Sequence, residues 1–227
     1  MLCLQGGAEF GPGCRGMDGD LLARAEGGPV VVTALAGAPG REYRTAGANG
    51  LRHFAALGAQ DVVVAPDARE DPDAALAVLR TARLLVLPGG SPSRLLDALR
   101  STGVGELVAE RSADGAVVMG SSAGAMVLCD WTVLPDRPGP GGGPAVVPGL
   151  GLVPDLLVLP HWSGPRGREP WLRAVASTVP PQVRVVGLPE QSGVLVGADG
   201  LTAVGSAAST VLSDGTALVL GETRRLA

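Results

Sequence analysis

The chain contains no lysine, because all eighteen of its basic residues are arginine. A phosphate-binding P-loop, a Schiff-base or pyridoxal enzyme and a Ser-Lys hydrolase each require a lysine, so these chemistries are excluded. Only two histidines are present, His53 and His161, which argues against a multi-histidine metal site. The chemistry left belongs to serine, histidine, carboxylates, arginine and backbone amides, and we expect neither a metal nor a cofactor.

Aromatic residues and long apolar runs are also scarce, and the chain has no excess of positive charge. Aromatics make up 3% of the chain and the net charge is −4, so there is neither a stacking platform nor a basic surface for nucleic acid. No window approaches the roughly 18 apolar residues of a membrane span, and the first residues lack a basic flank. Three cysteines (Cys3, Cys14 and Cys129) fit no metal or redox spacing and are expected as reduced thiols. We therefore expect a soluble cytoplasmic protein that binds neither nucleic acid nor membrane.

A length of 227 residues with 46% apolar residues suits one α/β domain, and we expect residues 1–227 to form it. Short β-branched runs alternate with longer Ala/Leu/Arg-rich stretches, which predicts βα units and a mainly parallel sheet. The predicted strands are Val30–Ala34, Val62–Ala65, Leu84–Leu87, Ala116–Met119, Leu156–Leu159 and Val183–Gly187. The predicted helices lie near 18–26, 42–57, 70–80, 91–99, 103–111, 123–129 and 168–178.

Two further segments differ in composition from these βα units. Four short apolar runs near the C-terminus are separated by Gly, Asp and Ser, which predicts an antiparallel meander. These runs are Gly193–Val196, Leu201–Val204, Thr210–Leu212 and Ala217–Leu220. The Pro/Gly-rich stretch from Pro135 to Pro148 is incompatible with a regular helix, so we expect a surface loop there, either a plain connector or part of the site rim.

Ser122 is the candidate nucleophile. It occupies the central position of the G-x-S-x-G pattern formed by Gly120 and Gly124, between a predicted strand and a predicted helix. In a nucleophile elbow, such a strained turn lifts the serine hydroxyl above the sheet, and small neighbours let strand and helix approach. The alternative is a Gly/Ser-rich turn whose serine has no catalytic role.

The two histidines are the candidates for the general base that activates Ser122. His161 directly follows the apolar run Leu156–Pro160, at the carboxyl end of a predicted parallel strand, where α/β folds gather their sites. His53 lies in a helical segment away from any strand end and is expected at the surface or in helix packing. His161 is therefore the predicted base.

A second glycine turn offers amide groups for an oxyanion. Gly89 and Gly90 follow the predicted strand Leu84–Leu87 and precede a helix. Backbone N–H groups in this turn, together with that of Ala123, can hold the negative charge of a tetrahedral intermediate. A simple β-to-α turn is the alternative.

Taken in order, these segments resemble one known family. They are the opening Leu4–Glu9, the turn Leu87–Gly90, the elbow Gly120–Ala125, the stretch Gly149–Pro154 leading to Pro160–Trp162, the arginines Arg166 and Arg168, and the turn Gly187–Glu190. The set resembles the serine peptidases that include dipeptidase E and cyanophycinase. The resemblance implies a three-layer α/β sandwich with a mainly parallel central sheet, class I glutamine amidotransferase-like, ending in the antiparallel meander.

The resemblance also implies roles. Ser122 would be the nucleophile, His161 its base, Gly89 or Gly90 with Ala123 the oxyanion donors, and Glu190 the acid that orients His161. For that acid, Asp130 and Asp136 remain alternatives. Arg166 and Arg168 are the implied substrate-carboxylate ligands, with a solvated arginine face as the other interpretation. Two departures weaken the substrate inference, since Leu159 replaces an acid before the histidine and Trp171 replaces a third arginine.

The predicted function is that of a serine-type peptidase or isopeptidase. It would hydrolyse aspartyl-containing substrates, either small peptides or a peptide-like polymer, through an acyl-enzyme on Ser122. The rivals are a non-catalytic amidotransferase-like binding module and, less favoured, an α/β-hydrolase esterase, whose histidine normally lies near the chain end. A cysteine-dependent amidotransferase is disfavoured because the elbow holds serine. The oligomeric state stays open, a homodimer included.

Overall fold

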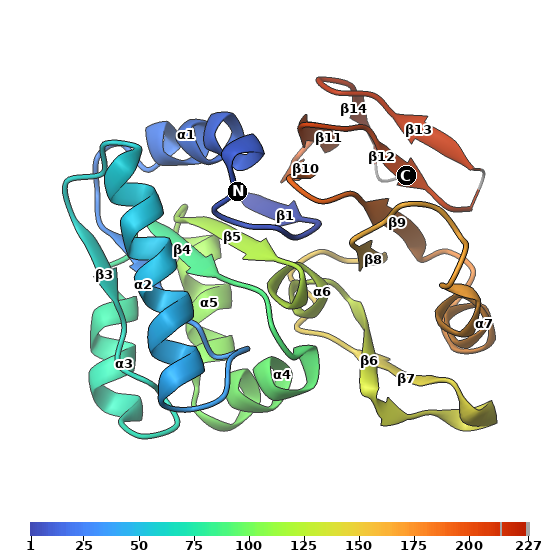
Figure 1. Cartoon of the computed structure of the whole chain (residues 1–227), viewed down its shortest axis with the longest axis horizontal. Coiled ribbons are helices and arrows are strands. Elements are labelled where there is room, and N and C mark those ends of the chain that lie inside the picture. Colours follow the sequence, from blue (N-terminus) through green and yellow to red (C-terminus); the bar gives the residue numbers. More distant parts are fainter. Residues whose placement is uncertain (214, 226–227) are drawn as a thin grey trace.

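The computed structural model describes residues 1–213 and 215–225, which form two larger sheets and a separate hairpin (Figure 1). The helices are α1 (Arg15–Arg24), α2 (Arg41–Ala56), α3 (Pro72–Leu79), α4 (Pro92–Ser101), α5 (Val104–Ala113), α6 (Ala123–Leu128) and α7 (Glu169–Thr178). The strands are β1 (Leu2–Gln5), β2 (Val30–Val32), β3 (Val62–Val64), β4 (Leu84–Leu87), β5 (Val117–Ser121), β6 (Trp131–Pro138), β7 (Pro144–Pro148), β8 (Leu156–Pro160), β9 (Arg184–Leu188), β10 (Ser192–Gly197), β11 (Gly200–Gly205), β12 (Ser209–Val211), β13 (Thr216–Leu218) and β14 (Thr223–Arg224).

The larger sheet has the order β14-β11-β10-β1-β5-β4-β2-β3. Its half from β1 to β3 is parallel, and β10, β11 and β14 are added antiparallel at the other edge. Parallel strands are covered by helices on both faces, so their sequences are apolar without alternation, as in Leu84–Leu87. The three-layer sandwich with a mainly parallel central sheet and antiparallel C-terminal strands, expected from the sequence, is thus confirmed.

Successive residues of the parallel strands feed two separate cores. Val30 and Val32 pack in a cluster with side chains of α1 and with Phe54 of α2. Val31, between them, packs in the other cluster, to which α3, α4, α5 and α6 contribute. This follows from the twofold side-chain period of a strand. The sheet is therefore held between two helical layers, and its carboxyl edge is left open for the loops of the site.

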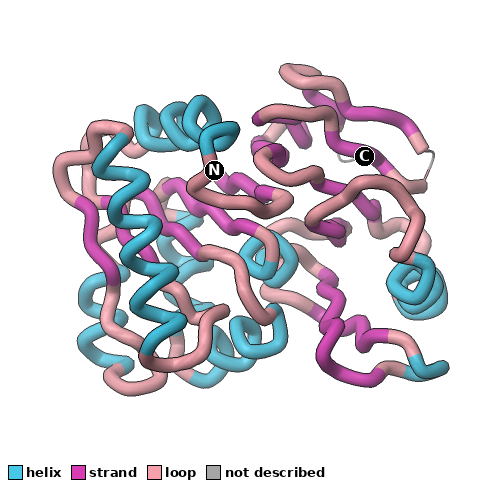
Figure 2. The backbone as a smooth tube through the Cα atoms, viewed as in Figure 1, coloured by secondary structure: helices cyan, strands magenta, loops and turns pink. Residues whose placement is uncertain are grey.

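The smaller sheet has the order β13-β12-β9-β8, with α7 at its side (Figure 2). Its strands β8 and β9 pair in parallel, as their sequences predict, but they do not join the central sheet. The predicted meander is also divided, since β10 and β11 belong to the larger sheet and β12 and β13 to the smaller one. Periodicity identifies strands and cannot assign them to sheets, because assignment depends on contacts distant in sequence.

The prediction of a surface loop over residues 135–148 was wrong. This stretch supplies the end of β6 and the whole of β7, which form a two-stranded antiparallel hairpin (Figure 1). Proline is excluded from helix interiors and central strands, but an edge strand tolerates it where its missing N–H would face away from the partner. Both strands of a two-stranded hairpin are edges, so the proline content was compatible with β structure.

The seven predicted helices are all present, with ends displaced by no more than a few residues. At two helices, a proline defines the starting residue more precisely than the apolar pattern does, because proline is favoured in the first turn of a helix. Pro72 follows Asp71, whose carboxylate accepts the N–H of Ala74, and Pro92 follows Ser91, whose hydroxyl accepts the N–H of Arg94. These caps place α4 directly after the glycine turn that follows β4.

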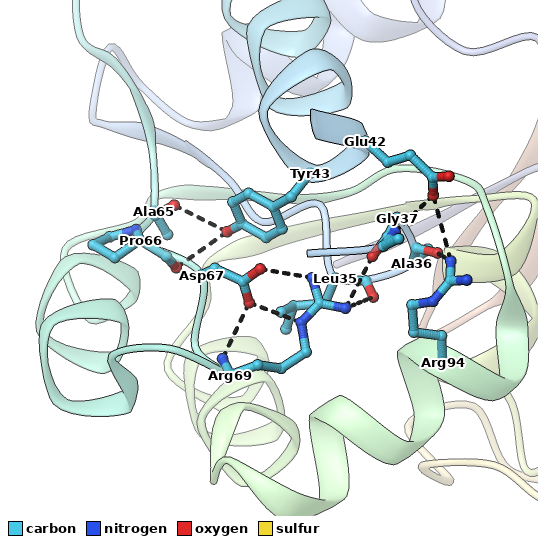
Figure 3. Close-up of polar contacts among 11 residues, drawn as sticks. Leu35, Ala36, Gly37, Glu42, Tyr43, Ala65, Pro66, Asp67, Arg69 and Arg94 are labelled. Atoms are coloured by element: carbon cyan, nitrogen blue, oxygen red, sulfur yellow. Dashed lines mark hydrogen bonds and ion pairs between the residues drawn. The ribbon is translucent and has the colours of Figure 1, made fainter. Parts of the chain in front are cut away.

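A partly buried ion pair holds the loop that follows β2 (Figure 3). Arg69 donates to both carboxylate oxygens of Asp67, at 2.8 and 2.7 Å. The remaining guanidinium nitrogen donates to the carbonyl oxygens of Leu35 and Gly37, at 3.3 and 2.9 Å. Burial alone would raise the pKa of Asp67, but the Arg69 hydrogen bonds and charge outweigh it and lower that pKa.

Replacing Arg69 by methionine should lower the free energy of unfolding by about 3 kcal/mol at pH 7, because Asp67 keeps a buried charge without its partner. Since folding lowers the pKa of Asp67, the pair stabilises fully above the pKa of the unfolded carboxyl and loses its effect as the pH falls through the folded pKa. The difference between parent and variant should therefore shrink in acid. Urea unfolding at several pH values measures it, with Arg80→Met at an exposed arginine as control. Equal stability at pH 7 would contradict the argument.

Candidate active site

Ser122 lies at the sharp turn between β5 and α6. Its backbone has φ 48° and ψ −110°, a conformation that non-glycine residues rarely adopt. Its N–H donates to the carbonyl of Gln5 at 2.9 Å, which ties the turn to the neighbouring strand β1. The surrounding structure maintains this strained backbone conformation, as is common at functional sites.

The helix after Ser122 packs closely on the adjacent strand β4. A Cβ at Gly124 would lie 2.1 Å from the carbonyl oxygen of Leu87, so no larger residue fits there. The first amide of α6, that of Ala123, lies at a helix start, where N–H groups have no intrahelical acceptor. The Gly-x-Ser-x-Gly pattern therefore reflects a packing requirement as well as a turn.

His161 reaches Ser122 from the smaller sheet. Its backbone N–H donates to the carbonyl of Gly6 at 2.7 Å, so the end of β8 is hydrogen-bonded to the end of β1 across the two sheets. His161 also has a positive φ, 53°. The parallel register pairs Pro160 with Leu188, which places the residues after β8 and β9 at the same edge. Sequence position alone put His161 at a strand end, and this contact between sheets brings it to the serine.

Ser122, His161 and Glu190 form a hydrogen-bonded series. Ser122 Oγ lies 3.0 Å from His161 Nε2, and His161 Nδ1 lies 2.9 Å from Glu190 Oε1. A carboxylate at Nδ1 requires the ring proton there, which leaves the lone pair of Nε2 facing the serine hydroxyl. The side chains of His161 and Glu190 are 42% and 58% exposed, so their pairing orients the ring and adds little stability.

The two alternative acids lie elsewhere. Asp136 accepts hydrogen bonds from the hydroxyls of Ser93 and Ser91, and the Ser93 bond is the main reason that its pKa is lowered. Among the described residues, neither Asp136 nor Asp130 contacts His161. Of the three carboxylates singled out in the sequence, Glu190 is the one within hydrogen-bond reach of the imidazole.

His53 is paired with a buried carboxylate of its own. It is 7% exposed, and its Nε2 lies 2.7 Å from the fully buried carboxylate of Asp18, which also accepts from Gln5 at 2.6 Å. Its ring packs against Phe10 and Phe54. The expectation of a helix-packing histidine therefore agrees with its surroundings, and the alternative of a surface position does not.

The predicted oxyanion amides differ in their availability. The N–H of Gly89 donates to Glu9 Oε1 at 2.8 Å and is therefore occupied. For the amides of Gly90 and Ala123, residues 1–213 and 215–225 supply no hydrogen-bond acceptor. The turn lies against the serine, since a Cβ at Gly89 would be 3.1 Å from the Cβ of Ser122.

The glycine turn is itself held by the loop after β2. The carbonyl of Ala36 accepts the N–H of Ser91 at 3.0 Å. It also accepts a guanidinium N–H of Arg94 at 2.8 Å (Figure 3). A Cβ at Gly90 would lie 2.6 Å from the same carbonyl oxygen. The ion pair of Asp67 and Arg69 thus holds the loop against which the glycine turn rests.

Arg168 and Arg166, the predicted substrate ligands, have different surroundings. Arg168 donates to the carbonyls of Pro160 and His161 at 2.9 and 3.2 Å, and its guanidinium lies 4.8 Å from the centre of the Trp171 ring. Partial burial lowers its pKa. Arg168 is therefore engaged in holding the backbone of His161. Arg166 is exposed and, within the described residues, forms no hydrogen bond or ion pair.

The two positions that depart from the family pattern also have structural roles. Leu159 is fully buried in the main core, and Trp171 packs against that core while covering Arg168. Neither side chain disturbs the Ser122–His161 contact. Both departures therefore leave the hydrogen-bonded series in place.

Glu9 lies at the site but was given no role from the sequence. Its carboxylate accepts the N–H of Gly89 and, at 3.0 Å, the hydroxyl of Ser121. An acid soon after a buried strand is a signal for a site residue, and Glu9 follows β1 by four positions. The signal was insufficient because the sequence does not show that β1 lies next to the strand carrying the serine.

Other potential reactive centres can be placed as well. Cys3, Cys14 and Cys129 are free and buried, and burial raises the pKa of Cys129 far above its ordinary value, so its thiol is a poor nucleophile. Within the described residues, no cluster of three or more His, Cys, Asp or Glu side chains could hold a metal ion. No helix found there is long and apolar enough to cross a membrane.

Comparison with known proteins now identifies the family. The model of peptidase family S51 matches residues 40–204, which include Ser122, His161 and Glu190. The chain belongs to peptidase family S51. This membership confirms the family predicted from the sequence motifs.

Individual relatives agree with this assignment. Peptidase E of Salmonella newport (strain SL254) and that of Salmonella typhi are each 33% identical over 128 residues, 53% of this chain and 55% of theirs. The chain thus spans about half the length of the curated relatives it matches. A crystal structure of a peptidase from an acI-B1 actinobacterium superimposes with a TM-score of 0.81 at 22% identity, covering 99% of this chain and 96% of that one. A putative peptidase E from Listeria monocytogenes EGD-e gives 0.64 at 16% identity, over 91% and 98%, and both structures share the fold.

Gly7 should be required for the position of His161. It has φ +122°, and a Cβ there would lie 2.2 Å from Cε1 of the His161 ring. The Gly7→Ala protein should therefore react with a fluorophosphonate probe about 100-fold more slowly, since a displacement of about 1 Å can cost that much. Gly16→Ala in α1 has open space around it and should keep the parent's rate. An unchanged rate in the Gly7 variant would refute the steric argument.

Proposed function

We propose that this chain is a serine peptidase of the dipeptidase E type, acting on aspartyl peptides through an acyl-enzyme on Ser122. The observation that carries the proposal is the hydrogen-bonded series from Ser122 Oγ through His161 to Glu190, at 3.0 and 2.9 Å. Membership of family S51 supports the reaction class. The name peptidase E, borne by the Salmonella relatives, supports the choice within that class.

In the acylation step, His161 acts as general base. Its Nε2 takes the proton of the Ser122 hydroxyl as Oγ attacks the scissile carbonyl carbon. The imidazole becomes a cation, and the Glu190 carboxylate at Nδ1 stabilises it while keeping the ring in its orientation. The strained turn of Ser122 presents the hydroxyl above the carboxyl edge of the sheet, as a nucleophile elbow does.

The carbonyl oxygen becomes negatively charged in the tetrahedral intermediate. We assign its stabilisation to the amides of Gly90 and Ala123, because the amide of Gly89 is occupied by Glu9. His161 then gives its proton to the leaving amine, and the acyl group remains on Ser122. In the second half of the reaction, His161 takes a proton from water as the water attacks the ester carbonyl. His161 then gives that proton to Ser122 Oγ as the ester bond breaks, which releases the acid and restores the Ser122 hydroxyl.

An aspartyl substrate brings a carboxylate near the serine. Arg166 follows His161 by five positions, is exposed and has a guanidinium available for a bidentate contact. Arg168 is proposed to act on the same subsite less directly, because it holds the His161 backbone. A small peptide fits the proposal, and a peptide-like polymer fits the exposed position of His161. Three free buried thiols also suit a reducing, cytoplasmic location.

Replacing Ser122 by alanine should reduce hydrolysis of an aspartyl dipeptide by about 10³-fold or more, because the attacking oxygen is lost while the fold is retained. A fluorophosphonate probe should label the parent and not the variant. Cys129→Ser, which changes a buried thiol, serves as a control that should still be labelled. A parent protein that neither hydrolyses nor labels would instead be a binding module.

Replacing Glu190 by alanine should lower kcat by about 10²- to 10⁴-fold, since His161 then lacks the group that fixes its tautomer. Asp130→Ala and Asp136→Ala are matched controls, because these acids do not contact His161. Both should retain most of the activity. Loss of activity in either control with retention in the Glu190 variant would identify a different orienting acid. Steady-state kinetics with an aspartyl dipeptide distinguishes the cases.

A further inference from the structure

Glu9 connects three strand ends at the proposed active site. The larger sheet has the local order β1-β5-β4, and Glu9 follows β1, Ser121 ends β5 and Gly89 follows β4. The carboxylate accepts the Gly89 N–H at Oε1, 2.8 Å, and the Ser121 hydroxyl at Oε2, 3.0 Å. The Glu9 side chain therefore links three neighbouring strands. It follows β1, and it contacts both the turn after β4 and Ser121, the residue before Ser122.

Glu9 is held in place by two neutral hydrogen-bond donors, the Ser121 hydroxyl and the Gly89 N–H. Ser121 is fully buried, and Glu9 is the partner of its hydroxyl, so this polar group would be left unsatisfied without it. No ion pair to Glu9 is found in the part of the chain that the structure describes, and the donors that it receives are neutral. Hydrogen-bond geometry, rather than a charge partner within the protein, accounts for where the carboxylate lies.

The backbone around Glu9 is held in an unusual conformation. Ala8 and Phe10, its two neighbours, have positive φ values of 51° and 64°. The carbonyl of Gly7 accepts the N–H of Gln191 at 2.9 Å, which fastens the segment to the residue after Glu190. Strain on both sides of a residue persists only where the surrounding structure determines it. The segment thus aims Glu9 at the glycine turn.

We propose that Glu9 is a positioning residue that fixes the oxyanion turn against the nucleophile. By holding the amide of Gly89, it sets the orientation of the next peptide group and so aims the Gly90 N–H at the carbonyl attacked by Ser122. By holding Ser121, it fixes the other side of the same gap. This inference rests on the proposed function, in which Gly90 and Ala123 stabilise the oxyanion.

The proposal predicts an effect on kcat rather than on KM. Oxyanion donors act on charge that develops in the transition state, so a misplaced donor slows the chemical step and leaves ground-state binding unchanged. Glutamine can replace the bridge, because its carbonyl accepts from Gly89 and its amide donates to the hydroxyl of Ser121. Alanine removes both contacts.

The experiment compares Glu9→Ala and Glu9→Gln with the parent, using hydrolysis of an aspartyl dipeptide and the rate of fluorophosphonate labelling. Glu9→Ala should lose about 100-fold in kcat and in labelling rate with KM little changed, the size expected for one oxyanion donor. Glu9→Gln should recover both rates to within about threefold of the parent, since the bridge is retained. Ser121→Ala, which removes one of the two contacts, should lie between them and remains informative if Glu9→Ala does not fold. Glu110→Ala on exposed α5 surface is the control that should match the parent.

Each result has a defined meaning. Equal losses in Glu9→Gln and Glu9→Ala would overturn the proposal, because they would show that the negative charge matters and not the bridge. A loss in Glu9→Ala that appears wholly in KM, or no loss in folded Glu9→Ala, would overturn it as well. A parent that fails to label and to hydrolyse would instead refute the proposed function, so the two failures are distinguishable. Melting temperatures of all variants identify those that remain folded.

Discussion

The backbone hydrogen bond from His161 N–H to the carbonyl of Gly6, 2.7 Å long, is the contact on which the site depends. Ser122 directly follows a strand of the larger sheet and His161 directly follows a strand of the smaller one, so neither sheet alone positions the pair. The bond joins the carboxyl edges of β1 and β8 directly beside both side chains. Parallel strands with matched register make this edge a natural place for a site, because every strand ends there on the same side.

Close approach at this junction has a conformational cost. Residues with positive φ gather there, namely Ala8, Phe10, Ser122, His161 and Gln191. Strained conformations of this kind each cost about 1–3 kcal/mol and persist when the surrounding contacts determine them. At Gly7 and Gly124 even a methyl group would collide with the neighbouring ring or carbonyl. Small residues and strained backbone are therefore two consequences of the same requirement, which is to bring two sheets and a helix within reach of one hydroxyl.

Polar groups around the junction act largely through the backbone. Arg168 holds the carbonyl of His161, Arg94 holds that of Ala36 beside the glycine turn, and Glu9 holds the amide of Gly89. Charged side chains that bind neutral backbone groups fix the orientation of those groups. Such bonds differ from exposed ion pairs, whose partners are free to move. Arg168 and Glu9 thus hold backbone groups on two sides of Ser122, whereas the guanidinium of Arg166 is exposed.

The sequence by itself determined the helices, most of the strands and two members of the hydrogen-bonded series, Ser122 and His161. Apolar period and proline positions are local signals, so the seven helices and the strand before His161 could be placed from the chain alone, as could Ser122 at its turn. What the residues of β8 and β9 could not disclose is that they form a second sheet, and the prolines of residues 135–148 concealed a hairpin. The choice of Glu190 over Asp130 and Asp136 came from family resemblance, and its distance from His161 depends on the register of β8 and β9. Glu9 gained its partners only by folding, because they lie 80 and 112 residues away and strand order is set by contacts distant in sequence.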